Sequence, residues 1–265
     1  MRKILFSLSV ILLLCFSVNA QEYDYCAGAG GVTACTDTTS TGLLIRQGFE
    51  SCTAGEGAGT CTALANAQTA TLDNNEVWTA TVTTGGAINV AHATSPMRGS
   101  YQLHVDGGDS TYTSLTSPTF SPSGNTTYYH FVFKFGVAPA SDRIIFAIRT
   151  SADAAIATIY LNPSAKLYIY QAGAADAVTT DALSANTAYH VWVSHTQGTG
   201  NNQTITLEFT AVGTASPTGS GNKYVISNTG TPTGAAGLIR YSSIVIDVYF
   251  DQGMVSNSAI TNVCE

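Results

Sequence analysis

The sequence predicts an all-β protein built as a two-sheet antiparallel β-sandwich or jelly roll, and two features carry this prediction. Over Thr127–Gly136, aromatic and β-branched residues alternate with polar ones, and Phe131, Phe133 and Phe135 share one side. A period of two with such residues is typical of a half-buried strand, and a face with three phenylalanines has to be buried against a second sheet. The other feature is repetition, because roughly a dozen short segments of this kind follow one another with hardly any helical periodicity.

Each expected strand is a short run of β-branched or aromatic residues that is separated from the next by turn-forming residues such as Gly, Pro, Asn or Ser. The turns Asn162–Ala165 and Thr196–Gln203 each join two neighbouring runs and predict two hairpins, whereas Ala63–Ala70 is expected to form a helical turn or two. The expected strands are, in chain order, Leu43–Phe49, Ala87–Ala91, Ser100–Val105, Tyr112–Phe120, Tyr128–Phe135, Arg143–Arg149, Ile156–Leu161, Lys166–Gln171, Ala188–His195, Thr204–Thr210, Leu238–Tyr241 and Ile244–Asp251.

The first twenty residues are expected to be a secretory signal peptide rather than part of the fold. Arg2 and Lys3 precede the apolar run Ile4–Phe16, and a small-residue cleavage site follows before Gln21. The apolar run is too short for a comfortable membrane span. Acylation of Cys15 is the alternative, which the leucine before it disfavours. The protein is therefore predicted to be secreted.

About 245 residues remain after this segment, which suits one large all-β domain. Residues 21–42 are expected to form a Gly-rich N-terminal segment and residues 43–265 the sandwich. Without Arg2 and Lys3, eight basic residues face 17 acidic ones, so the formal charge is −9. This charge argues against nucleic acid and anionic membranes as partners. Charged residues make up only 10% of the chain, which fits an extracellular surface solvated by hydroxyls and amides.

Five cysteines follow the signal segment, and in an exported protein they are expected to pair. Cys26 and Cys35 have the same nine-residue offset as Cys52 and Cys61, so each pair is expected to close a short loop. This pairing leaves Cys264 odd. The rival pairing joins Cys264 to Cys26 or Cys35 and so ties the two ends together.

A family resemblance rests on the order of several motifs. The motifs are Gly48–Glu50 (GFE), Pro96–Val105 (PMRGSYQLHV), the aromatic strand, KLYIY, YHVWV and a last strand with the sequence IDVYFDQGMVS. In this order they resemble the concanavalin A-like lectin and glucanase jelly rolls, especially laminin-G-like domains of secreted proteins, over roughly Leu43–Ser258. Such folds include lectins, carbohydrate-binding modules, glucanases, lyases and adhesins, so the resemblance implies a fold without choosing a function.

The motifs that catalysis on this fold needs are not found. A retaining glucanase needs two closely placed carboxylates, in an E-x-D-x-x-E arrangement, but Asp247 and Asp251 are four residues apart and no Glu accompanies them. An alginate-lyase-like site needs Arg-x-Glu, Gln-x-His and Tyr-x-Lys strands, which Arg143, Tyr189–His190 and Lys166–Tyr168 only echo. No G-x-S-x-G elbow occurs either. The protein is therefore expected not to be an enzyme, and catalysis remains the third alternative.

A binding face is easier to assemble from the outward positions of the expected strands. Pyranose rings bind to flat aromatic surfaces and to planar hydrogen-bond donors. If the expected strands align, such groups gather on one face. The predicted carbohydrate-binding residues are His130, Arg149, Tyr168, Tyr170, His190 and Trp192. The alternative is that outward aromatics only cover the sheet beneath a neighbouring loop.

A structural calcium ion is a further expectation from the resemblance. Glu50 near the first strand and Asp251 near the last one match by position, with Asp247 as a substitute, and backbone carbonyls would complete the oxygen shell. Solvated surface acids are the alternative interpretation of these residues.

The leading functional prediction is a secreted, non-catalytic domain that binds a carbohydrate or a cell-surface polymer. A structural or adhesive extracellular protein, such as a surface or filament subunit that associates with itself through an edge strand, is the second prediction. A polysaccharide lyase or a glycoside hydrolase without its usual motif is the third.

Overall fold

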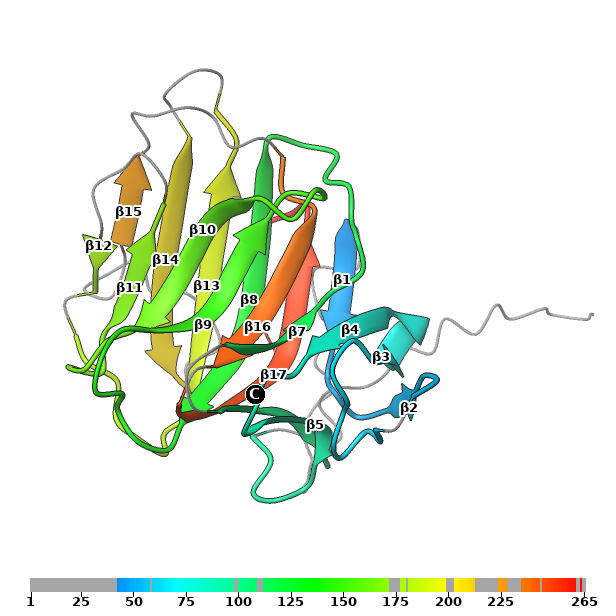
Figure 1. Cartoon of the computed structure of the whole chain (residues 1–265). Helices are drawn as coiled ribbons and strands as arrows, with labels where there is room; N and C mark the ends of the chain where they lie inside the picture. The colour runs from blue at the N-terminus through cyan, green and yellow to red at the C-terminus, as the bar shows by residue number, and fades with distance from the viewer. Residues whose placement is uncertain are drawn as a thin grey trace, which may run out of the picture.

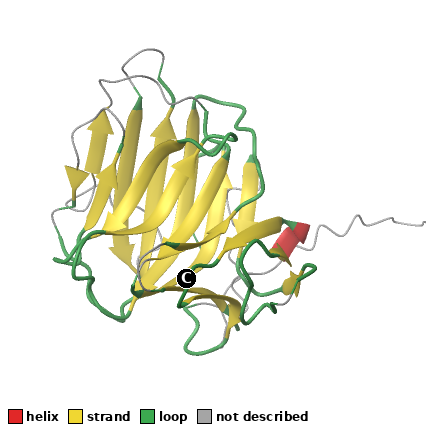
Figure 2. Cartoon of the chain, viewed as in Figure 1, coloured by secondary structure: helices red, strands yellow, loops and turns green. Residues whose placement is uncertain are grey.

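The computed structural model describes residues 42–57, 59–97, 100–108, 112–171, 177–179, 181–198, 203–212, 224–227, 235–243, 245–260 and 263. Nearly all regular structure among them is β, with one short 3-10 helix, η1 (Asp73–Asn75) (Figure 2). Two predicted features lie outside the described residues. One is the signal segment, residues 1–20, with the stretch that follows it up to residue 41; the other is any disulfide that involves Cys26, Cys35 or Cys264.

Two antiparallel sheets face each other, which confirms the predicted β-sandwich (Figure 1). The eight-stranded sheet runs in the order β15 (Tyr224–Ser227), β14 (Thr204–Ala211), β13 (Tyr189–Thr196), β8 (Thr126–Phe135), β17 (Asp247–Ser256), β6 (Gln102–Gly107) and β5 (Gly86–His92), and β1 (Leu43–Gln47) also pairs with β17. The nine-stranded sheet runs in the order β12 (Ala177–Val178), β11 (Leu167–Tyr170), β10 (Ala155–Leu161), β9 (Arg143–Arg149), β16 (Leu238–Ser243), β7 (Thr113–Thr116), β4 (Val77–Thr81), β3 (Thr69–Leu72) and β2 (Cys52–Ala54).

The core lies between the sheets and is rich in aromatic rings. Phe131, Phe133 and Phe135 of β8 are at most 1% exposed, as their alternation predicts. Phe131 packs against Phe146 of β9 and Tyr241 of β16, with ring centroids 4.6 and 6.0 Å apart. These contacts join the two sheets, so the three phenylalanines of β8 fix which side of the eight-stranded sheet faces outward.

Both predicted hairpins form. β10 pairs with β11 across the Asn162–Ala165 turn, and β13 pairs with β14 across the longer loop. The predicted helical turn at Ala63–Ala70 is wrong, because this stretch is a loop that leads into β3. The side chain of Gln68 holds that loop by accepting from Ala65 N and donating to the carbonyls of Gly55 and Gly59. These bonds replace the ones a helix would make.

The Cys52–Cys61 disulfide is present, as the sequence predicts. It closes the excursion between β2 and the loop before β3, beside the edge of the nine-stranded sheet.

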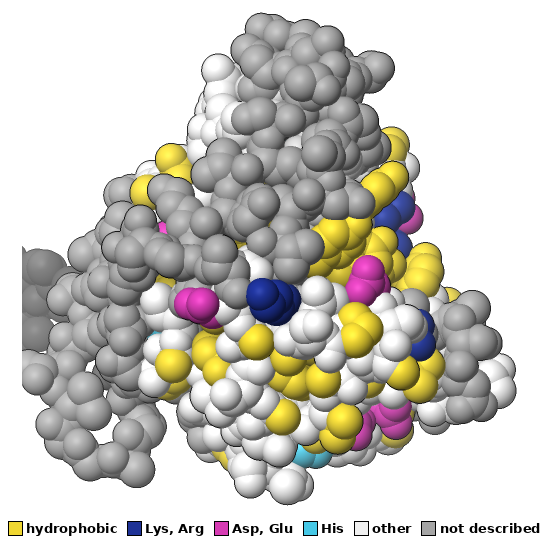
Figure 3. Space-filling model, turned by 90° about the vertical axis from the view of Figure 1, so that its left-hand side faces the viewer, with side chains coloured by type: hydrophobic (Ala, Val, Ile, Leu, Met, Phe, Trp, Pro, Cys, Tyr) yellow, Lys and Arg dark blue, Asp and Glu magenta, His cyan; other side chains and the backbone are white. Residues whose placement is uncertain are grey.

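Few charged side chains interrupt the surface. Viewed from the left-hand side of Figure 1, a small number of acidic and basic side chains are visible among hydrophobic and uncharged polar ones (Figure 3). In the part of the chain that is described, no helix has the length and apolar character needed to cross a membrane.

Candidate functional site

The outer face of the eight-stranded sheet, which points away from the nine-stranded one, carries two rows of polar and aromatic side chains. Residues directly opposite each other on paired strands point to the same side. The register across β17, β8, β13 and β14 therefore defines the first row as Met254, His130, Trp192 and Glu208, and the second as Asp251, Val132, His190 and Thr210.

The six predicted carbohydrate-binding residues do not form one face. His130, His190 and Trp192 lie together on β8 and β13, whereas Arg149, Tyr168 and Tyr170 lie on β9 and β11 of the other sheet. The single-face prediction is wrong because consecutive strands of the chain are divided between the two layers. Alternation along a strand says which residues share a side, not which sheet the strand joins.

The three predicted residues on this face are also less exposed to solvent than predicted. His130, His190 and Trp192 were expected to meet solvent, but they are 1%, 0% and 6% exposed. Trp192 packs in a small apolar cluster with Met254, Ile260 and Val263, so the chain beyond β17 covers this part of the face. The sequence could not show this cover, because it comes from residues almost seventy positions away along the chain.

The two histidines form a hydrogen-bonded pair beneath Trp192. His130 Nδ1 is 3.2 Å from the carbonyl oxygen of Gln252, and His130 Nε2 is 3.0 Å from His190 Nδ1. A carbonyl only accepts, so for neutral rings the Nδ1–H of His130 donates to it and the Nδ1–H of His190 donates to His130 Nε2. Both rings lie 5.3 Å from the indole and support one side of it.

A β-bulge in β17 presents the Gln252 carbonyl to this pair. Asp251 pairs with Val132 and Met254 pairs with His130, so β17 has one residue more than β8 between these points, and Gln252 has a positive φ of 47°. Bulges re-aim side chains and often lie next to functional sites. Here the bulge leaves Asp251 fully buried on the outer face.

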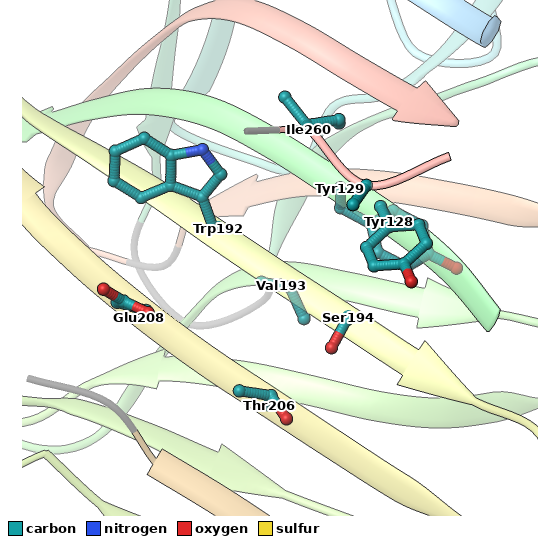
Figure 4. A pocket seen from close by; sticks show the side chains of 9 residues that line it. Tyr128, Tyr129, Trp192, Val193, Ser194, Thr206, Glu208 and Ile260 are labelled. Atoms are coloured by element: carbon teal, nitrogen blue, oxygen red, sulfur yellow. The ribbon is translucent and has the colours of Figure 1, made fainter. Parts of the chain in front are cut away.

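A hollow of about 140 Å³ opens beside Trp192. Figure 4 shows Trp192 and Ile260 on one side of it and Glu208 and Thr206 on the other. We call it the Trp192 hollow and define it by the residues Tyr128, Trp192, Ser194, Thr206, Glu208 and Ile260. Glu208 is 5% exposed, and the indole Nε1 of Trp192 is buried without a hydrogen-bond partner among the described residues. A buried donor of this kind is costly unless a ligand or a water molecule satisfies it.

Another group of side chains lies on the same face over β5, β6, β17 and β8, and we call it the His104 cluster. The ring of His104 stacks on Tyr249, with centroids 4.7 Å apart and an interplanar angle of 13°. Lys134 is on β8, and its Nζ lies 4.9 Å from the centroid of the Tyr249 ring. His104 Nε2 lies 2.8 Å from Asp247 Oδ1. The cluster consists of His92, His104, Lys134, Asp247 and Tyr249, all of which are at least partly exposed.

The electrostatics differ across the His104 cluster. Burial lowers the pKa of His92, and the neighbouring His104 and Lys134 lower it further, while Asp247 opposes them. Burial raises the pKa of Tyr249, and Asp247 and Asp106 add to this. Lys134 therefore adds a positive charge to the cluster, and Asp247 and Asp106 add negative ones.

The sequence interpretation missed two features of this face. Glu208 was not singled out, although the hairpin register that pairs Thr196 with Thr204 also places it opposite Trp192. The other is the alternation of Gln102 and His104 on β6, a Gln-x-His pattern. The Gln102 amide is fully buried, accepts from Met97 N and donates to Thr94 O and His92 Nδ1. It therefore orients His92 and the loop that follows β5.

The predicted calcium ligands have other partners. Glu50 accepts hydrogen bonds from Ser100 N and Tyr101 N, and Asp247 is paired with His104. Burial raises the pKa of Glu50 despite these bonds. Among the described residues, no group of three or more His, Cys, Asp or Glu side chains is arranged to hold a metal ion. Backbone N–H groups hold the Glu50 carboxylate, so these contacts do not point to a cation there.

The two buried carboxylates of the outer face are too far apart for paired-carboxylate hydrolysis. Asp251 and Glu208 lie on β17 and β14, three strand spacings apart, which is roughly 14 Å between backbones. Glycoside hydrolases need carboxyl groups about 5 to 9.5 Å apart.

No family model matches the chain, and no curated protein matches it. Among solved structures it is similar to the binding domain of botulinum neurotoxin serotype C1, with a TM-score of 0.50, 8% identity and 86% of this chain covered. The chain spans 50% of that toxin chain. It is also similar to a botulinum neurotoxin type C structure described by its interaction with two ganglioside molecules (TM-score 0.48, 7% identity, 86% of this chain and 49% of that chain). A third similar structure is the PL-14 alginate lyase from Aplysia kurodai (TM-score 0.49, 8% identity, 63% of this chain and 86% of that chain).

The likeness to the serotype C1 binding domain supports the sandwich fold alone. It supports a β-sandwich of the jelly-roll kind, and not the narrower concanavalin A-like or laminin-G-like family that the sequence resembles. A fold does not determine a function, so the function has to be argued from the site.

Proposed function

We propose that the protein binds carbohydrate without cleaving it, and that one sugar ring occupies the Trp192 hollow. The observation that carries this proposal is the pairing, in one hollow, of an indole whose N–H has no partner among the described residues with the carboxylate of Glu208 opposite. Sugars present both an apolar C–H face and hydroxyl groups, and therefore need both kinds of surface at once.

The dimensions of the hollow limit what it holds. Pockets for drug-sized ligands have volumes of about 300 to 1,000 Å³, so a hollow of about 140 Å³ suits a single ring. In this arrangement the edge of the Trp192 indole meets the sugar, because its N–H lies in the plane of the ring, and this N–H donates to a ring or hydroxyl oxygen. Glu208 accepts from sugar hydroxyls, and Thr206 and Ser194 can donate or accept. A terminal sugar unit, or one unit of a longer chain, fits this description.

We propose further that the protein is exported. The basic and apolar N-terminal pattern predicts it, and the Cys52–Cys61 disulfide is of the kind that persists in oxidising compartments. Mass spectrometry of the protein recovered from the culture medium checks this: a mature N-terminus at Gln21 supports export, and an intact Met1 in a cell-bound protein contradicts it.

The test is a glycan and polysaccharide binding screen with variants that spare the fold. Because Trp192 is 6% exposed, Trp192→Ala is expected to weaken the fold as well as the site. Trp192→Phe keeps an aromatic ring and removes the N–H, and Glu208→Gln removes the charge at nearly constant volume. Each is expected to lower affinity about tenfold, the order of a hydrogen bond lost from a desolvated site.

The matched control is Tyr170→Ala, which removes an aromatic ring from the other sheet, where Tyr170 is 44% exposed. It is expected to leave binding unchanged. If Tyr170→Ala abolishes binding while Trp192→Phe does not, the hollow is the wrong site. If the folded wild-type protein binds nothing on the panel, with calcium or with chelator, carbohydrate recognition is wrong.

A second candidate function is that of a polysaccharide lyase, and the Gln-x-His arrangement on β6 favours it. His104 is oriented by Asp247 and stacks beside Tyr249, so a base and an acid lie next to each other on an open part of the sheet. The engagement of Gln102 in three hydrogen bonds weighs against it as a substrate ligand. Incubation with uronate polymers distinguishes the two functions, because elimination creates a double bond that absorbs ultraviolet light and simple binding does not.

A further inference from the structure

The His104 cluster presents hydrogen-bond donors to solvent. The Gln102 amide is oriented by its bonds to Met97 N and Thr94 O, so its Nε2 group donates to His92 Nδ1 at 3.3 Å. A neutral His92 therefore carries its proton on Nε2, the nitrogen that the amide does not occupy. Lys134 Nζ donates to Ser95 O at 3.0 Å and keeps two more N–H groups. Both groups are partly exposed.

Neighbouring side chains pack around the Tyr249 ring. His104 lies parallel to one face of Tyr249, and Lys134 Nζ lies over the Tyr249 ring. His92 also packs at 5.5 Å from Tyr249. A ligand at this cluster is therefore more readily held by the N–H groups of His92 and Lys134 than by stacking on Tyr249. Such a site selects a ligand by a hydrogen-bond acceptor, whereas the Trp192 hollow selects it by a ring.

Lys134 is the cation of this region and favours an acceptor that is negative, whereas the carboxylates of Asp247 and Asp106 lie near Tyr249. The Asp247 carboxylate is bound to His104, and the charge of the buried Asp251 carboxylate also acts on Lys134. His104 and Lys134 together disfavour a proton on His92. Burial is the main cause of the lowered His92 pKa, but the charge of Lys134, which adds to it by repelling a proton, also attracts an anion.

We propose that His92 and Lys134 bind the carboxylate of an acidic sugar unit in the same polymer that the Trp192 hollow holds. The inference rests on the proposed function and names its substrate class, an acidic polysaccharide built from uronate units. Lys134 and Trp192 lie on adjacent strands four residues apart in register, which is about 14 Å between backbones. A ligand that reaches both places therefore has to be an oligomer.

The experiment measures the affinity of the full chain for alginate and for polygalacturonate, each beside its carboxyl-reduced, neutral form. The wild-type protein is expected to bind the acidic form about tenfold more tightly, and added salt is expected to reduce this preference. Lys134→Gln is expected to abolish the preference and to leave the affinity for the neutral polymer unchanged. The matched control is Lys166→Gln, which changes a lysine directly before β11 of the other sheet. This variant is expected to keep the preference.

The outcomes separate this inference from the proposed function. Equal wild-type affinity for acidic and neutral polymers, with binding still dependent on Trp192, overturns the carboxylate site and leaves the hollow in place. An acid preference that survives in Lys134→Gln also overturns it. A preference for a sulfated, carboxyl-reduced polymer over the uronate polymer assigns the cluster to sulfate esters and contradicts the proposal as stated. If neither form binds, the proposed function fails first and this inference falls with it.

Discussion

The Trp192 hollow and the His104 cluster share one sheet face and one of its strands, β8, yet they differ in what lies above them. Both draw on β8, where His130 and Lys134 are outward by the same alternation. His130 is 1% exposed, because the region around it is covered, whereas the side chain of Lys134 reaches solvent. The strand pattern thus decides which side a residue faces. The segments that return over the sheet decide whether the residue is core or surface.

The bulge at Gln252 lies between the two regions along β17. On one side of it Tyr249 joins the open cluster, and on the other Met254 joins the covered apolar group. The bulge therefore lies between the partly exposed Tyr249 and the packed Met254, directly after the buried Asp251. If this comparison is correct, equivalent substitutions in the two regions have unequal consequences.

The largest expected difference is between Trp192→Ala and Tyr249→Ala. The first removes a buried indole from the group it forms with Met254 and Ile260 and is expected to cost about 3 kcal/mol or more of unfolding free energy. The second removes a partly exposed ring and is expected to cost about 1 kcal/mol or less. Urea unfolding followed by circular dichroism measures both, since Trp192 is one of two tryptophans and its loss alters fluorescence. Equal costs would show that the two regions are not packed differently.

A smaller effect is expected from Gly253→Ala at the bulge. A Cβ at Gly253 would lie 2.2 Å from the hydroxyl oxygen of the fully buried Tyr241, so the core has to shift. Such overpacking typically costs about 1 to 3 kcal/mol. The control is Gly136→Ala, where nothing lies within 4 Å of the added atom and no packing penalty is expected. A Gly253→Ala protein as stable as the wild type would mean that the bulge adapts freely.

Still smaller is the expected effect of Asp247→Asn, which removes the charge opposite His104. Asp247 has a side-chain exposure of 53%, and exposed ion pairs contribute roughly 0 to 1 kcal/mol. Thermal unfolding of this variant is expected to match that of Asp142→Asn, an exposed acid before β9, within that range. A loss of several kcal/mol would show that the His104 cluster is part of the core after all.

The sequence allowed the fold to be predicted because alternation and turn residues are local signals. The inward side of β8 and the two hairpins were predicted correctly, and so was the Cys52–Cys61 bridge. The grouping of Arg149 with Trp192 failed because sheet membership depends on contacts between strands that are distant along the chain. The burial of Trp192 beneath the chain that follows β17 was not predicted for the same reason. The position of Glu208 opposite Trp192 is predictable from the sequence, since a hairpin register fixes every cross-strand pair once one pair is known.

The smallest expected effect is a pH dependence confined to the open region. The pKa of His92 is lowered by burial and then by His104 and Lys134, with Asp247 opposing and Tyr249 packed alongside. Below its ordinary value of 6.5 the unfolded chain binds a proton at this position more readily than the folded protein does. Stability is therefore lost as the pH falls through this window.

Burial raises the pKa values of Glu50 and Glu76, so the dependence of their stability contribution on pH has the opposite sign, in the wild type and in any variant that keeps them. The difference between the wild type and His92→Asn, which retains an acceptor for Gln102, removes their contribution. Between about pH 7.5 and pH 5.5 the wild type is expected to lose more unfolding free energy than the variant. Parallel curves would place the His92 ring in solvent, and a wild type that gains stability relative to the variant would mean that Asp247 outweighs Lys134 and His104.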